Sequence, residues 1–323
     1  MAPPNPPRLL DQLRDSLTLG HYSPRTVEAY VTWVRRFILF NHKRHPRELG
    51  EADVRAFLTD LAVGRSVAAS TQNQALGALL YLYRHIIKRE LSDLGKIPRG
   101  RTPTTLPVVL SRLEVRAVLA KLDGVAWLVV ALLYGAGLRL TEGLELRVKD
   151  LDFDRQQVMV RRGKGQKDRA VPLPALVRAK LTSHLEDVRR QHTEDLSHGF
   201  GAVVLPDAIG VKYPNAAKSW PWQFVFPAGR ICRDPKWGPP SRFHLHETVI
   251  PREVARAARE AGVSKRVRCH TFRHSFATHL LEDGYDIHTV QELPGHADVS
   301  TTMIYTHVLQ KGALGVRSPA DSL

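Results

Sequence analysis

Helical periodicity dominates the first part of the chain. In HYSPRTVEAYVTWVRRFILF, Ser23 can cap a helix that has Pro24 at its first position. The apolar residues that follow recur at helical spacing, and two similar stripes come later. The three stripes are Val27, Tyr30, Val31 and Val34; Val54, Phe57, Leu58 and Leu61; and Leu76, Leu79, Leu80, Tyr83 and Ile87. This pattern predicts a small all-helical bundle.

A proline- and glycine-containing stretch, KIPRGRTPTTLP, interrupts the helical pattern at 96–107. Its composition is typical of an interdomain linker. A chain of 323 residues accommodates two domains, because a domain takes about 100 to 200 residues. We therefore predict a helical domain at 1–95 and a second domain at 108–323.

The second domain begins with helical signals and then changes pattern. Ser111 and Glu114 match a capping box, and the apolar segment WLVVALLYG predicts a buried helix that ends around Gly135. Between 152 and 174, two short apolar runs flank GKGQK, which predicts a β-hairpin with Lys164 at its tip. The expected fold is mainly α with a small β-hairpin or sheet.

The segment at about 192–245 looks irregular. It is rich in glycine and proline and holds Trp220, Trp222 and Trp237. A long loop-rich segment inside a domain is usually functional or disordered. Helical patterns return at PREVARAAREAG, at TFRHSFATHLLEDG and in the closing stretch of the chain.

The charge balance indicates a polyanionic partner. Lys and Arg number 47 against 32 Asp and Glu, which gives a formal charge of +15. A nucleic acid or an anionic membrane could be that partner, but no apolar run approaches the roughly 20 residues that span a bilayer, and no signal peptide opens the chain. The two cysteines suit neither a disulfide framework nor a zinc site. We expect a cytoplasmic protein that binds nucleic acid and no membrane.

Basic residues crowd the polar side of the first domain. Lys43, Arg44, Arg84 and Lys88 are our candidates for contacts with a nucleic-acid backbone. The alternative is a solvated basic surface, which is common.

A metal site is a rival interpretation of the histidines in the second domain. His270 and His274 are four residues apart, and His279 follows. The glutamate of an HExxH motif is missing, however, and the step from His274 to His279 does not keep to one helical face. We therefore expect no metal.

Donors suited to a phosphate recur along the second domain. They are Arg139, Lys164, His270, Arg273 and His296, and one phenol, Tyr305, follows them. Taken singly, each has an ordinary explanation as a surface ion pair, a helix cap or a packed side chain. Together they suit phosphoryl transfer, in which positioning and charge stabilisation do most of the catalysis, with a tyrosine nucleophile and a lysine acid.

Two stretches resemble the boxes that define the tyrosine recombinases. GAGLRLTEG is similar to the first box, and HTFRHSFATHLLEDGYDIHTVQELPGHADVSTTMIYTH is similar to the second. The GKG hairpin lies between them, and the bundle before the linker resembles the core-binding, SAM-like domain of this family. The resemblance implies that the second domain is an α+β catalytic domain.

The resemblance also assigns roles. Arg139 and Arg273 would clamp the scissile phosphate, and His270 would act as a donor or proton shuttle. Lys164 would be the general acid for the 5′ oxygen, and Tyr305 would form the 3′-phosphotyrosine.

Two further residues would support this reaction. His296 would bond a non-bridging oxygen, and Glu142 would orient the site without attacking. The resemblance implies no metal, ATP or other cofactor, because the phosphotyrosine bond conserves the phosphodiester energy. It also implies a homotetramer in the synaptic complex, assembled from free monomers.

The segments GVKYPNAAKSWPWQFVFP and RDPKWGPPSRFHLHETV resemble the extra block of the integron integrases. These bacterial enzymes move gene cassettes between a double-stranded attachment site and a cassette site that folds as a single-stranded hairpin with extrahelical bases. An extrahelical base needs a stacking surface, which contributes about 1 to 3 kcal/mol. We expect Trp222 to be that surface, with Pro235 and His244 at a second base pocket, although a packed structural role for Trp222 stays open.

Three positions depart from the family pattern. Phe243 stands where the integron enzymes carry a first histidine before His244, and Pro251 falls inside an expected helix. Pro294 replaces a leucine before Gly-His, which removes a backbone donor and a buried leucine. The alternatives are therefore a Xer- or phage-type recombinase on duplex sites, a DNA-binding protein with an impaired active site and, with weaker support, a type IB topoisomerase.

Overall fold

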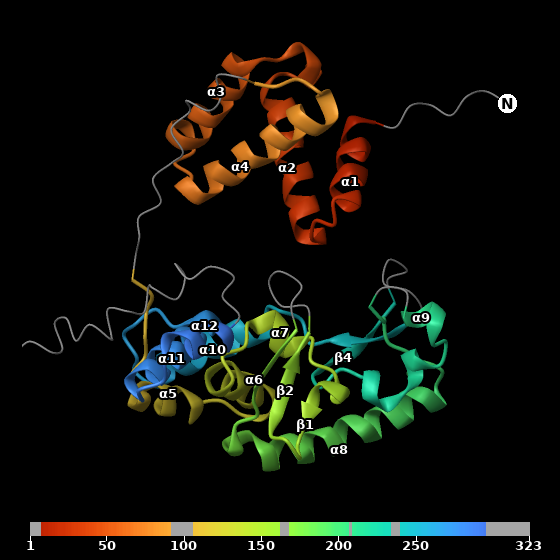
Figure 1. Cartoon of the computed structure of the whole chain (residues 1–323), viewed down its shortest axis with the longest axis vertical. Coiled ribbons are helices and arrows are strands. Elements are labelled where there is room, and N and C mark those ends of the chain that lie inside the picture. The colour runs from red at the N-terminus through yellow and green to blue at the C-terminus, as the bar shows by residue number, and fades with distance from the viewer. Residues whose placement is uncertain (1–7, 92–105, 162–167, 207–208, 234–239, 295–323) are drawn as a thin grey trace, which may run out of the picture. The chain divides into compact units, whose positions relative to one another are not determined.

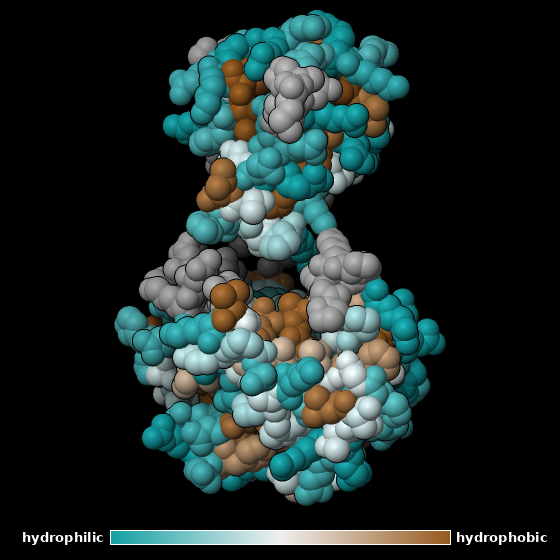
Figure 2. Space-filling view, turned by 90° about the vertical axis from the view of Figure 1, so that its right-hand side faces the viewer, coloured by the Kyte–Doolittle hydropathy of each residue, from teal (hydrophilic) through white to brown (hydrophobic). Residues whose placement is uncertain are grey.

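The computed structural model describes residues 8–91, 106–161, 168–206, 209–233 and 240–294. By its internal contacts the chain divides into two compact units, residues 1–105 and 106–323. The predicted linker at 96–107 lies mostly outside the described residues. On the face shown in Figure 2, hydrophilic residues cover most of each unit and hydrophobic residues form small groups.

The first unit is the predicted helical bundle. Its main helices are α1 (Leu9–Leu19), α2 (Pro24–Phe40), α3 (Glu51–Thr59) and α4 (Ala69–Tyr81), with a 3-10 turn η1 (Pro46–Glu48) and two π-helical turns, η2 (Asp60–Gly64) and η3 (Leu82–Ile87) (Figure 1). The Ser23 hydroxyl accepts from the Thr26 N–H at 3.2 Å, and Pro24 opens α2, so the predicted helix start is confirmed. Phe37, Phe57 and the other stripe residues fill the core. The bundle thus follows from local periodicity.

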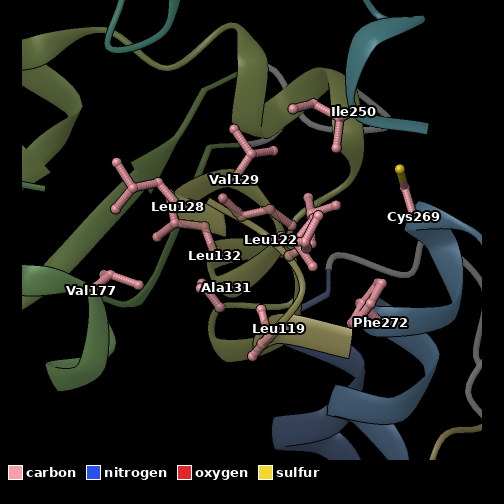
Figure 3. Packing of buried hydrophobic residues seen from close by; sticks show 14 of the residues in the cluster. Leu119, Leu122, Leu128, Val129, Ala131, Leu132, Val177, Ile250, Cys269 and Phe272 are labelled. Carbon is pink, nitrogen blue, oxygen red and sulfur yellow. The ribbon is translucent and has the colours of Figure 1, made fainter. Parts of the chain in front are cut away.

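The second unit is built around α6 (Gly124–Gly135), which is apolar on all sides and is contacted by α8 (Ala175–Ser197), α10 (Val249–Glu260) and α11 (Cys269–Glu282). A helix that is hydrophobic all round must be buried, as predicted for this segment. Figure 3 shows Leu128, Val129 and Leu132 of α6 among the buried side chains of this core. The other helical segments are α5 (Arg112–Leu119), α7 (Leu140–Leu144), α9 (Ile209–Lys212), α12 (Ile287–Glu292) and the 3-10 turns η5 (Val148–Asp150), η6 (Ala216–Lys218) and η7 (Trp220–Trp222).

The predicted hairpin is confirmed and belongs to a three-stranded antiparallel sheet. Its strands are β1 (Leu151–Asp152), β2 (Gln157–Val160) and β3 (Arg169–Pro172). Val160 pairs with Arg169 at the open end of the hairpin. Lys164 lies between these strands in residues 162–167, outside the described residues.

The prediction of irregular structure from residue 192 is wrong at its beginning. Helix α8 continues to Ser197, because its buried polar residues find partners in the segment that follows. The Nε2 of His192 contacts the carbonyl oxygen of Lys218 at 3.0 Å, and Asp195 is held by both ends of the Arg242 guanidinium. The rest of the segment includes the antiparallel pair β4 (Pro227–Cys232) and β5 (Ser241–His244).

Pro251 does not shift the start of α10. The helix begins at Val249, so the proline is its third residue. The first four N–H groups of a helix have no intrahelical acceptor, and a proline there sacrifices no hydrogen bond.

Within the described ranges, no helix is long and apolar enough to cross a bilayer. In the same ranges, no cluster of three or more His, Cys, Asp or Glu side chains could hold a metal ion.

Candidate active site

Glu142 is the centre of the candidate site. It lies in the first turn of α7, where its carboxylate accepts from the backbone N–H of Arg139 at 2.8 Å and from the Arg139 guanidinium at 2.6 Å. The predicted pairing of these residues across one helical turn is therefore confirmed. The Glu142 side chain is 9% exposed and that of Arg139 is 23% exposed, so the pair is not an ordinary surface salt bridge.

A second arginine on Glu142, Arg169 of β3, was not among the predicted site residues. Its two terminal nitrogens donate to the two carboxylate oxygens of Glu142 at 3.1 and 2.7 Å, and its Nε donates to the carbonyl oxygen of Leu293 at 2.8 Å. The sequence did carry a signal. Alternation along β3 puts Arg169 on the same face as the buried Val171, so an inward-facing arginine could have been inferred.

Arg273 of α11 is 1% exposed and lies under the same site. Its guanidinium donates to the carbonyl oxygens of Gly137, at 2.5 Å, and of Pro294, and it lies 4.0 Å from the Glu142 carboxylate. Gly137 has a positive φ of 65°, and a Cβ there would stand 2.5 Å from the Phe276 ring. The glycine therefore allows α11 to approach the loop that carries Arg139.

Charge explains the state of Glu142. Burial opposes its ionisation, but hydrogen bonds from Arg169 and Arg139 outweigh that effect and lower its pKa to about 2. One carboxylate thus faces three guanidinium groups, those of Arg139, Arg169 and Arg273. The excess positive charge favours an anionic ligand such as a phosphate diester.

His270 is the second residue of α11 and is exposed to solvent, although neighbouring side chains reduce the hydration of its ring. This desolvation, followed by the positive charges of Arg273 and Arg139, lowers the pKa of His270. Its ring packs edge to face on His274, with centroids 4.6 Å apart. Desolvation and the charges of its neighbours lower the pKa of His274 to about 4. Both rings are therefore neutral at neutral pH, and His270 can donate through one nitrogen and accept through the other.

Pro294 is buried and follows α12, and its carbonyl oxygen accepts from Arg273. The proline ring thus occupies a buried position, as expected for the leucine that it replaces. His296 and Tyr305 come next in the chain and lie outside the described residues, as does Pro235.

Trp222 is half-buried in the segment that follows α8. The Lys149 ammonium lies 3.1 Å from the centroid of its indole ring, and the Arg147 guanidinium lies 5.7 Å from it. Arg147 also donates to the carbonyl oxygens of Trp222, at 2.6 Å, and Val204, at 2.7 Å. These contacts fix the segment to the catalytic unit next to the sheet.

His244, the second expected base contact, lies in β5. Its Nδ1 donates to the Leu245 carbonyl oxygen at 2.8 Å, and its ring contacts Phe243 and Phe224 with centroids 4.4 and 5.4 Å away. Phe224 in turn lies under the Arg147 guanidinium, 4.3 Å from it. His244 and Trp222 are therefore linked through one group of aromatic and cationic side chains.

The predicted contacts of the first unit, Lys43, Arg44, Arg84 and Lys88, are all exposed. Lys43 and Lys88 have left-handed backbone conformations, and Lys88 ends η3. Exposure suits both a DNA contact and a solvated surface, so their role stays a prediction.

Comparison with known proteins defines the class. Residues 110–311 match the Phage integrase family, and residues 9–93 match the N-terminal SAM-like domain of phage integrases. The chain therefore belongs to the phage integrase family of tyrosine recombinases, which carry out site-specific DNA recombination. The six predicted catalytic residues all fall within the first match.

Relatives and solved structures agree with this class. The chain is 50% identical over 316 residues to an integrase/recombinase of Escherichia coli, covering 98% of this chain and 94% of that protein. It is 33% identical over 305 residues to the tyrosine recombinase XerA of Thermococcus onnurineus, covering 93% and 90%. The fold is similar to that of XerH recombinase bound to its difH substrate, with a TM-score of 0.62, 22% identity, and 95% and 84% coverage.

Proposed function

We propose that this recombinase is an integron integrase, which integrates and excises gene cassettes by cutting and rejoining DNA. The observation that carries the cleavage chemistry is the convergence of Arg139, Arg169 and Arg273 on one buried carboxylate, Glu142, beside His270. A site of this charge suits a phosphate diester, and the family supplies the reaction.

Cleavage would begin with attack of the Tyr305 hydroxyl on the phosphorus. Arg139 and Arg273 would neutralise the non-bridging oxygens, while His270 and His296 would donate hydrogen bonds to them. The P–O5′ bond would break as Lys164 protonates the leaving 5′ oxygen, which leaves a 3′-phosphotyrosine. Attack of a new 5′ hydroxyl would reverse these steps and rejoin the strand. The guanidinium groups supply the charge that Mg²⁺ supplies in other phosphoryl transfers, so we propose that the reaction needs no metal.

The segment after α8 supports the integron assignment. Arg147 holds this segment against the catalytic unit, and Trp222 stands there with the Lys149 ammonium on its ring. An extrahelical base would displace the lysine and stack on the indole, while the ammonium would turn to a nearby phosphate. His244, and Pro235 outside the described residues, would line a second base pocket.

Assembly is proposed from the family. A lambda integrase tetramer has been solved on a Holliday junction, and XerH has been solved on difH. We propose that this chain acts as a homotetramer in the synaptic complex and is monomeric when free, in the bacterial cytoplasm with the nucleoid.

A Xer-type recombinase on duplex sites is the second candidate. The 33% identity to a XerA recombinase over most of both chains favours it. In this case the Trp222 indole would serve as a packing surface for Lys149 and Arg147, with no base contact.

The experiment that separates these candidates compares two DNA ligands of one sequence. One is a single strand of a cassette site folded into a hairpin with extrahelical bases, and the other is the perfect duplex. Binding is measured by anisotropy at several salt concentrations, because phosphate contacts make affinity salt-dependent. Tighter binding to the folded strand at each salt concentration supports the integron assignment, whereas a clear duplex preference defeats it.

A further inference from the structure

We propose that Arg169 is a positioning residue for DNA cleavage. It holds the Glu142 carboxylate and the backbone of Leu293 in one geometry. This inference rests on the recombinase chemistry proposed above, but not on the choice between folded and duplex sites.

Arg169 is committed to protein partners. Each of its three guanidinium nitrogens donates to Glu142 or to Leu293, and its side chain is 12% exposed. Arg169 thus stands behind the carboxylate, and the phosphate contacts are left to Arg139 and Arg273. Its effect on the reaction must pass through the groups that it holds.

The first of these groups is Glu142. Each of its carboxylate oxygens accepts one bond from Arg169 and one from Arg139. With Arg169 in place, the carboxylate has a single orientation, and this orientation fixes the Arg139 guanidinium. Without the fork of Arg169, Glu142 could rotate toward Arg139 or Arg273 and occupy the N–H groups that the phosphate needs.

The second group is the backbone after α12. The carbonyl oxygen of Leu293 accepts from Arg169, and that of the next residue, Pro294, accepts from Arg273. Two arginines from separate elements, β3 and α11, therefore hold adjacent peptide groups. This part of the chain leads directly to Gly295 and His296.

A lysine at 169 would keep the positive charge and lose the geometry. Its single nitrogen cannot bond both carboxylate oxygens and the Leu293 carbonyl at fixed angles. Arg169→Lys therefore separates positioning from charge.

The same unit offers a matched control in Arg242. Its guanidinium holds both oxygens of Asp195 and one carbonyl oxygen, that of Ala228, and its side chain is 17% exposed. Arg242→Lys breaks an equivalent set of bonds away from Glu142. A loss caused by weakened folding alone would affect both variants.

The test measures the single-turnover rate of covalent adduct formation at saturating DNA, together with DNA affinity and thermal unfolding. The probes are a folded cassette-site strand and a nicked duplex of the same site. We expect Arg169→Lys to lower the adduct rate by roughly 10- to 100-fold, the effect of a small misplacement at a reacting centre. DNA affinity should change less than about threefold, and Arg242→Lys should keep the wild-type rate within the same factor.

A second substrate, with sulfur in place of the bridging 5′ oxygen, locates the defect. Tyrosine attack on phosphorus then breaks the P–S bond, and the thiolate leaves without a proton. The loss in Lys164→Ala should be largely rescued by this substrate, whereas the loss in Arg169→Lys should persist, because the phosphate remains misplaced. A wild-type adduct rate in Arg169→Lys, or rescue by sulfur, would overturn the positioning role. Absence of any wild-type adduct on both probes would instead overturn the proposed chemistry and this inference with it.

Discussion

Arg273 donates a hydrogen bond to the carbonyl oxygen of Pro294, so a buried arginine of α11 holds the chain two residues before His296. A residue at 294 therefore affects both the orientation of Arg273 and the path toward His296. The carbonyl oxygen is present whatever the side chain. What the proline changes is the missing N–H and the shape of a buried side chain.

We predict that Pro294→Leu raises recombination. Leucine restores the N–H donor and fills the buried position with a longer apolar side chain, while the Arg273 contact remains available. The gain should be roughly 3- to 10-fold, within the range that small shifts at a reacting centre produce. The measurement is recombination frequency between two sites on reporter plasmids.

Pro251→Gln is the control for Pro294→Leu. Pro251 lies in the first turn of α10, where its missing N–H has no acceptor, so activity should stay at the wild-type level. Recombination by Pro294→Leu equal to or below that of the wild type would count against the account of this residue.

The pH dependence of stability should reveal the Glu142 cluster. The folded pKa of Glu142, about 2, is below its ordinary value of 4.5, so its stabilisation is present above pH 4.5 and is lost as the pH falls toward 2. The shift corresponds to about 3 kcal/mol of unfolding free energy. Urea titrations of the wild type and Glu142→Gln should differ by about this amount at pH 7 and converge as the pH falls below 4.5. A constant difference across that range would show that the carboxylate charge is not stabilising.

His274 should titrate far below an ordinary histidine. Its folded pKa is about 4, so the folded state binds fewer protons than the unfolded state between pH 6.5 and 4. Its contribution to stability is therefore present above pH 6.5 and declines as the pH falls to about 4. NMR titration of the imidazole protons should give a midpoint near 4 for His274, and a midpoint below 6.5 for His270. A His274 midpoint above 6 would mean that the ring is hydrated and does not pack on His270 as described.

The helical fold could be predicted because its signals are local. Ser23 caps α2, Ser111 caps α5 through a capping box, and the apolar run of α6 is buried, each as its own sequence indicates. Leu80 shows the limit of such patterns. It continues an apolar stripe but is 37% exposed, because the face of α4 that carries it is not covered.

The site could be predicted only where partners are neighbours in the sequence. Arg139 and Glu142 are three residues apart, and helical spacing brings them together. Arg169 is 27 residues from Glu142, and their contact depends on how β3 lies against α7, which no local pattern specifies. For the same reason the end of α8 was missed, since its polar residues are satisfied by Lys218 and Arg242 from later in the chain.

Trp222 and Trp220 should behave differently as binding residues. Trp222 carries Lys149 on its ring, whereas Trp220 lies beside His192 and Arg189 of α8. If a base stacks on Trp222, Trp222→Ala should weaken binding of the folded strand by roughly 5- to 150-fold, the equivalent of 1 to 3 kcal/mol. Trp220→Ala should leave the affinity per folded molecule within about twofold, and binding to the duplex should change little in either variant. Equal losses on both DNA forms would assign Trp222 a structural role.

The most direct test of the account is the covalent intermediate itself. The wild type is incubated with a nicked folded cassette-site strand in EDTA, the reaction is stopped with detergent, and protein-linked DNA is resolved by electrophoresis. We predict an adduct that forms without metal, is absent in Tyr305→Phe and persists in Tyr285→Phe, whose tyrosine is 53% exposed on the same unit. An adduct retained in Tyr305→Phe, or no adduct with the folded strand or its duplex, would contradict the account.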